Sequence, residues 1–134
     1  MNTIIKKVLI VDDEPHVLKE LPKAFSKHFS DREVHTAHSF EIAEKLIQQN
    51  NYEIIMLDGM LSDSITDPPE HGFGYNLIPL IKEKSDDTVI IMISTDWDYR
   101  DIGEKLGAHF KISKNFFFKN ARVVGYLQPD FTVD

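Results

Sequence analysis

Four apolar runs of the sequence end in residues that can bind phosphate or a divalent cation. Asp12 and Asp13 follow KVLIV, Asp58 follows EIIML, Ser94 follows TVIIMI, and Lys114 lies just after HFKI. Three carboxylates held together repel one another unless a cation lies among them, and an all-oxygen set of ligands selects Mg²⁺. The cation and the lysine would attract a phosphoryl group, whose oxygens a serine hydroxyl can bind. The chemistry predicted is attack of an aspartate on phosphorus to form an acyl phosphate.

Asp58 is the nucleophile that we favour, because it stands alone after its run whereas Asp12 and Asp13 form a pair suited to hold a metal. Each of these residues also has an ordinary explanation. The acidic pair can favour a helix dipole, Asp58 can be a turn residue, Ser94 can cap a helix, and Lys114 can be a solvated surface lysine. Only their convergence at one place argues for a site.

That convergence depends on a parallel sheet. Strands are predicted at residues 7–11, 33–37, 53–57, 88–93 and 109–112, and helical patterns lie between them. Strands alternating with helices at this spacing form right-handed βαβ units, with helices on both faces of the sheet. Ligands of such sheets bind beyond the carboxyl ends of the strands, which is where the candidate residues stand.

The intervening helices have recognisable starts and one irregularity. Pro15 suits the first turn of the first helix, and Pro22 is expected to kink that helix or delay its regular part. Ser39 is expected to cap the second helix. A third helical pattern runs from Tyr75 to Ile81, and a fourth extends to about residue 106.

Composition excludes several classes of protein. The 134 residues carry a net charge of -7, 42% hydrophobic residues and no cysteine, which indicates one folded domain, residues 1–134, without thiolate or disulfide chemistry. No apolar run approaches the roughly 20 residues of a membrane span, and no cleavable leader is evident, so we expect a cytoplasmic protein without membrane contact. The acidic balance argues against direct binding of nucleic acid.

The segments VLIVDDEP, IIMLDGML, VIIMISTD and GAHFKISKNF resemble the receiver domain of two-component response regulators over about residues 6–116. The resemblance implies a flavodoxin-like, doubly wound sheet of five strands in the order 2-1-3-4-5. It also implies a phosphoprotein that carries an aspartyl phosphate, taken from a sensor histidine kinase or a phosphotransfer protein. Such a chain is a signalling switch and not a turnover enzyme, and it acts on a downstream protein target or effector domain.

By the same resemblance, Asp58 is the phosphoacceptor. Asp13 and Asp58 would ligate Mg²⁺ together with the backbone carbonyl of Met60, and Asp12 would support the metal through water. Ser94 would bind the phosphoryl group, and Lys114 would form a salt bridge to it.

The sequence departs from the family pattern beside the acceptor. Ser62 stands where receivers usually have a proline, and about eight extra residues fall within residues 61–73. This insertion carries Asp63, Asp67, Glu70 and His71, and it either shapes access and partner choice or is an ordinary acidic loop.

Two further departures lie near the carboxyl terminus. Lys111 replaces the usual aromatic residue of the last strand, which places the family's aromatic switch in doubt. The tail, residues 117–134, contains Val123-Val124, Gly125 and Pro129, so an atypical segment is expected in place of a full fifth helix. An uncovered last strand would suggest a homodimer or a further domain, and a short distorted helix is the alternative.

Two other functions remain as alternatives. A degenerate receiver, which would bind partners constitutively without phosphorylation, is favoured by Lys111 and the unusual tail. A phosphatase of the haloacid-dehalogenase type would also use aspartate, Ser or Thr, lysine and Mg²⁺. That family places an Asp-x-Asp after its first strand, which Asp12-Asp13-Glu14 does not supply.

Overall fold

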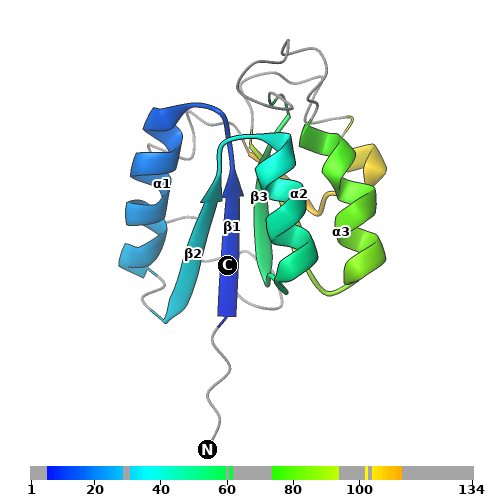
Figure 1. Cartoon of the computed structure of the whole chain (residues 1–134), viewed down its shortest axis with the longest axis horizontal. Coiled ribbons are helices and arrows are strands. Elements are labelled where there is room, and N and C mark those ends of the chain that lie inside the picture. The colour runs from blue at the N-terminus through cyan, green and yellow to red at the C-terminus, as the bar shows by residue number, and fades with distance from the viewer. Residues whose placement is uncertain are drawn as a thin grey trace, which may run out of the picture.

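The computed structural model of the chain describes residues 6–28, 31–59, 61, 74–93, 102 and 104–112. Among these, the five strands pair in parallel in one sheet of order β2-β1-β3-β4-β5 (Figure 1). The strands are β1 (Lys6–Val11), β2 (Arg32–Ala37), β3 (Ile54–Asp58), β4 (Val89–Ile93) and β5 (Phe110–Ile112). The predicted doubly wound sheet and its strand order are confirmed. The expected replacement of the fifth helix lies outside the described residues.

The central strands are apolar on both faces because helices cover both sides of the sheet. Every residue of β3 and β4 is buried. One face packs under α2 (Phe40–Gln49) and α3 (Ile78–Lys84), which lie side by side in front of the sheet in Figure 1. The other face packs against Val17 and Leu21 of α1 (Pro15–His28). A continuous apolar strand of this kind is typical of a parallel sheet buried on both faces.

The helix starts follow their local sequence. Ser39 caps α2 as predicted, because its hydroxyl accepts the N–H of Ile42 at 3.2 Å. Helix α1 runs unbroken through Pro22, so this proline does not end it. The third predicted helix begins instead as a 3₁₀ turn, η2 (Gly74–Leu77), and becomes α-helical at Ile78. Pro79 lies in the first α-helical turn, where its missing N–H costs no intrahelical bond.

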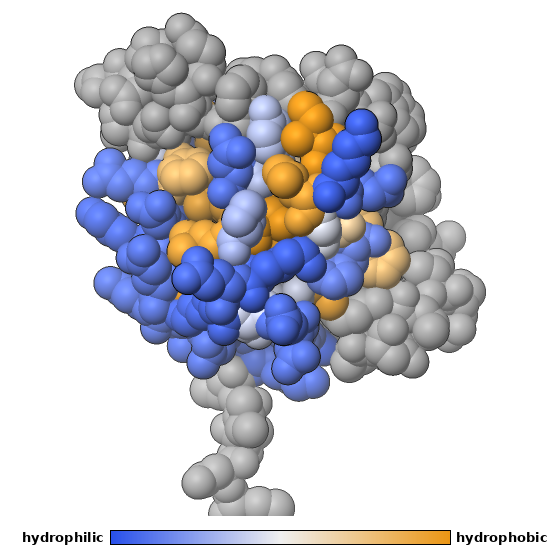
Figure 2. All heavy atoms as spheres, turned by 90° about the vertical axis from the view of Figure 1, so that its right-hand side faces the viewer, coloured by the Kyte–Doolittle hydropathy of each residue, from blue (hydrophilic) through white to orange (hydrophobic). Residues whose placement is uncertain are grey.

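The described residues expose few large hydrophobic side chains. The side of the molecule shown in Figure 2 exposes hydrophobic atoms between hydrophilic side chains. Ile102 and Leu106, in a helical stretch that precedes β5, are the large hydrophobic residues more than a third exposed among those described. None of the helices in the described part of the chain has the length and apolar character to span a membrane.

Candidate functional site

The site begins where β1 ends. Asp12 follows Val11 directly, is fully buried, and donates its backbone N–H to the carbonyl of Ala37 at 3.0 Å. Its Oδ1 accepts the N–H of Glu14 at 2.8 Å, just before α1 begins. Asp12 thus forms a local turn immediately before the helix, and this turn fixes the direction of its carboxylate.

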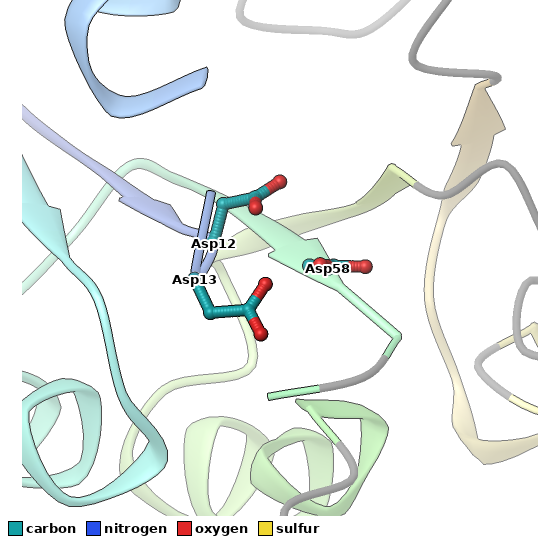
Figure 3. A group of neighbouring side chains, drawn as sticks. All are labelled: Asp12, Asp13 and Asp58. Atoms are coloured by element: carbon teal, nitrogen blue, oxygen red, sulfur yellow. The ribbon is translucent and has the colours of Figure 1, made fainter. Parts of the chain in front are cut away.

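The other two acids approach Asp12 because β1 and β3 are neighbours in the sheet. Val11 pairs with Leu57, which places the next residue of each segment, Asp12 and Asp58, at the same carboxyl edge. Asp13 is exposed, whereas Asp58, the last residue of β3, is only 5% exposed. One carboxylate oxygen from each of Asp12, Asp13 and Asp58 lies within 4.8 Å of the other two (Figure 3). The topology therefore gathers three acids from two chain segments.

Like charges this close are unfavourable, and two of the three acids are buried where water screens them poorly. A divalent cation would convert the repulsion into attraction. The ligand set fits Mg²⁺: every donor is a carboxylate oxygen, there is no nitrogen or sulfur donor in this group, and exposed Asp13 leaves a side open to water. Mg²⁺ keeps several waters and readily takes phosphate oxygens in their place.

The chain returns to the end of β3 at Gly74, which we did not single out from the sequence as a site residue. Its N–H donates to the carbonyl of Gly59 at 3.0 Å, and a Cβ built on it would lie 1.8 Å from the carbonyl oxygen of Asp58. The only sequence signal is its place between a Pro- and Gly-containing loop and the start of a helical pattern. Nothing in that pattern says which backbone the glycine approaches.

Of the predicted site residues, the structure brings together Asp12, Asp13 and Asp58. Ser94, Lys114 and Met60 lie outside the described residues, so their roles stay predictions. Of the insertion, only Leu61 is described, and it is fully buried. Lys111 is in β5, paired in register with Met92, as its assignment to the last strand requires.

Comparison with known proteins agrees with this geometry. The sequence model of the response regulator receiver domain matches residues 8–124. The response regulator TrrA from Thermotoga maritima, solved in complex with Mg²⁺ and BeF, is 28% identical with a TM-score of 0.67, over 90% of this chain and 97% of that one. No curated protein matches the chain.

Two more distant structures have the same fold. A CheY-like receiver domain protein from Methanospirillum hungatei is 18% identical with a TM-score of 0.71, over 91% of this chain and 94% of that one. The response regulator DrrB, a Thermotoga maritima OmpR/PhoB homologue, is 23% identical with a TM-score of 0.73. The alignment covers 96% of this chain but 55% of DrrB, so this chain spans about half the length of that regulator.

Proposed function

Because the chain belongs to the response regulator receiver domains, we propose that it is a phosphorylation switch whose acceptor is Asp58. The donor would be the phosphohistidine of a sensor histidine kinase or of a phosphotransfer protein. The observation that carries this proposal is the position of Asp58, which is buried at the end of the central strand β3 within 4.8 Å of two other acids. An isolated turn aspartate would have no reason to lie among like charges.

The proposed step is an in-line transfer. A carboxylate oxygen of Asp58 attacks phosphorus, and an O–P bond forms as the N–P bond of the phosphohistidine breaks. The electron pair of that bond returns to the imidazole nitrogen, which takes up a proton from solvent. The product is an acyl phosphate on Asp58. Its later hydrolysis releases inorganic phosphate and restores the carboxylate, so one cycle of the switch consumes one phosphoryl group.

The three acids would hold the Mg²⁺ ion that this step requires. Asp13 and Asp58 would hold Mg²⁺ directly with the carbonyl of Met60, and buried Asp12 would support it through water. When bound, Mg²⁺ neutralises charge on the phosphoryl oxygens. Asp12 is held in place by its bond from the N–H of Glu14, so its carboxylate is oriented before any ligand arrives.

Ser94 and Lys114 complete the proposal through the family resemblance. The Ser94 hydroxyl would donate a hydrogen bond to a phosphoryl oxygen, and the Lys114 ammonium would pair with another. Both follow strands that lie on the same side of β3, Ser94 after β4 and Lys114 after β5. A phosphorylated site of this kind would shift the domain between two conformations, which a downstream protein target or effector domain distinguishes. A second copy of the chain is a further candidate partner.

Intact mass spectrometry after incubation with acetyl phosphate tests the proposal directly. The wild type should gain one phosphoryl group when Mg²⁺ is present and none when it is chelated. Asp58→Asn should gain none under either condition, because an amide oxygen is a poor nucleophile for this transfer. The matched control is Asp86→Asn, at an exposed turn before β4, which should be labelled as the wild type is.

The remaining outcomes separate the alternatives. If the wild type binds Mg²⁺ but takes no label, the phosphorylation proposal is wrong and the chain is a degenerate receiver. Steady release of phosphate from a phosphate ester over many turnovers would instead identify a phosphatase. Label that persists in Asp58→Asn would assign the acceptor to another residue.

A further inference from the structure

We propose that Gly74 is a positioning residue for the chemistry at Asp58, an inference that rests on the proposed phosphoacceptor function. Gly74 is buried at the start of η2, where the chain comes back to the end of β3. Its backbone contacts the backbone of the proposed acceptor itself. It would act through Asp58 and not on the phosphoryl group.

The contact leaves no room for a side chain. A Cβ on Gly74 would meet the Asp58 carbonyl oxygen at 1.8 Å, its carbonyl carbon at 3.1 Å and the Leu61 side chain at 3.2 Å. The first contact is with backbone, which cannot swing aside as the end of a flexible side chain can. Gly74 is therefore required here for close approach of two backbone segments.

A hydrogen bond locks the same two segments together. The Gly74 N–H donates to the carbonyl of Gly59 at 3.0 Å, so the residue after the acceptor is held as well. On its other side, the end of β3 is held by the register of Asp58 with Ile93 in β4. The peptide planes that flank Asp58 are thus fixed from two directions, and its carboxylate inherits that orientation.

An alanine at position 74 would displace Asp58 more than it would displace η2. Leu77 and Ile78, the residues that end η2 and begin α3, are fully buried under the sheet and resist movement. Asp58 is the part that can yield, because the pairing of β3 with β1 stops at Leu57 and, among the described strands, only β4 pairs with Asp58 itself. Relieving the contact needs a separation of about 1 Å, and misplacement of a reacting group by about 1 Å can slow a reaction about 100-fold.

Gly107 provides a matched control at the other end of the sheet. It has a positive φ of 115°, and a Cβ there would meet the Cε of Lys82 at 2.1 Å, so alanine is strained at this position also. Gly107 precedes β5, on the side where the strands begin. Gly107→Ala should therefore lower stability without moving the acids.

The experiment compares wild type, Gly74→Ala and Gly107→Ala below the unfolding midpoint of each, with the folded fraction checked by circular dichroism. For Gly74→Ala we expect the rate of labelling by acetyl phosphate to fall about 10- to 100-fold. We also expect its Kd for Mg²⁺, measured by calorimetry, to rise several-fold, because Asp58 no longer faces the other two acids. Gly107→Ala should match the wild type in both measurements.

Each outcome bears on a different claim. If Gly74→Ala is labelled and binds Mg²⁺ as the wild type does, the positioning role is wrong even though the phosphoacceptor proposal stands. If the wild type takes no label, the phosphoacceptor proposal fails, and the Mg²⁺ titration alone still decides whether Gly74 positions Asp58. Equal losses in the two glycine variants would also overturn the positioning role.

If Gly74→Ala does not fold, the inference can be tested on the wild-type protein by nuclear magnetic resonance. Addition of Mg²⁺ should shift the amide resonance of Gly74, since the carbonyl that it donates to follows the acceptor. The amide of Gly107 should not shift. An unmoved Gly74 resonance at saturating Mg²⁺ would overturn the inference.

Discussion

Charged groups are arranged in opposite ways at the two edges of the sheet. At the carboxyl edge, Asp12, Asp13 and Asp58 bring three like charges within 4.8 Å of one another, and two of the three side chains are buried. At the amino edge, Arg32 Nε pairs with Glu53 Oε1 at 2.9 Å, and Lys6 pairs with the other carboxylate oxygen at 3.2 Å. The Arg32–Glu53 pair is largely buried, with 7% of the Arg32 side chain and 17% of that of Glu53 exposed, whereas 45% of the Lys6 side chain is exposed.

Other polar groups away from the acid site are also matched with partners. The Lys84 ammonium donates to the carbonyls of Ile47, Gln48 and Asn50 at the carboxyl end of α2, where a cation suits the helix dipole. The Tyr52 hydroxyl lies 2.7 Å from Nδ1 of His35. Burial, with a contribution from the charge of Glu33, raises the pKa of Tyr52 to about 12, so this phenol stays protonated at neutral pH.

The two edges should therefore respond differently when a charged group is removed. Burying a matched pair is close to neutral, and removing one partner is costly because the other is left buried and charged. Burying like charges close together is unfavourable unless an opposite charge lies among them. The amino edge should therefore be sensitive to loss of charge, and the carboxyl edge should gain stability from it.

The largest expected effect comes from removing one partner of the Arg32–Glu53 ion pair at the amino edge. Arg32→Met should destabilise the protein by about 3 kcal/mol, because Glu53 keeps its charge in a largely buried position with only the half-exposed Lys6 left to balance it. The measurement is urea unfolding at pH 7. As a control, Asp31→Asn removes an Arg32 partner whose side chain is 76% exposed, and it should change stability by less than about 0.5 kcal/mol. Equal effects of the two variants would contradict the role given to burial.

Binding of Mg²⁺ at the carboxyl edge should change the stability of the protein by a slightly smaller amount. Mg²⁺ at about 100 times its Kd should stabilise the wild type by about 2.7 kcal/mol, because it binds only the folded state. Urea unfolding with and without Mg²⁺ measures this, with Ca²⁺-free buffer and matched ionic strength. In Asp58→Asn, which removes one ligand charge, the gain should be much smaller at the same Mg²⁺ concentration. An equal gain would place the cation elsewhere.

Without the metal, neutralising one acid should itself stabilise the protein. Asp12→Asn removes a fully buried charge and keeps an oxygen to accept the N–H of Glu14, so the local turn survives. We expect a gain of about 1 kcal/mol in the absence of Mg²⁺, and a weaker response to Mg²⁺. Thermal unfolding in chelator measures the first effect. Loss of stability would mean that the Asp12 charge is favourable in the apo protein, contrary to the comparison.

The sequence was sufficient to place Asp12 and Asp58 at the carboxyl edge, because each of them follows an apolar run directly. A parallel strand buried on both faces needs a continuous apolar segment, so the end of each segment locates the edge, and Asp12 and Asp58 fall there. The strand order came from the family resemblance, and the structure confirms it. The 3₁₀ start of the third helix was not predicted. The apolar residues of this segment are spaced as in an α-helix, and that spacing does not distinguish a 3₁₀ turn at its start.

The contacts between distant segments could not be predicted in the same way. Gly74 lies 16 positions after Asp58, and its approach to that residue depends on how the chain returns after the loop. The pairing of Arg32 with Glu53 likewise joins two strand starts that only the sheet brings together. Such contacts are set by tertiary packing, which leaves no periodic signal in the residues themselves.

The smallest expected effect concerns a polar contact at the amino edge that depends on pH. His109 donates its backbone N–H to the carbonyl of Ile90 at 2.8 Å, and its Nδ1 accepts the N–H of Ile90 at 3.1 Å. The second bond requires a neutral ring. Partial desolvation of the ring, with a contribution from the charge of Lys82, lowers the pKa of His109 even though the residue is exposed, in agreement with that requirement. This contact extends the pairing of β4 with the chain that leads into β5.

The sign of the pH effect follows from the lowered pKa. The unfolded chain takes up a proton at this histidine near its ordinary pKa of about 6.5, before the folded protein does, so stability is lost as pH falls below that value. His109→Gln has no titrating ring, so its stability difference from the wild type should change between pH 7.5 and pH 5.5, with the wild type losing more. Contributions of the other histidines cancel in the difference. A difference that stays constant over this range would show that the neutral His109 contact does not stabilise the join between β4 and β5.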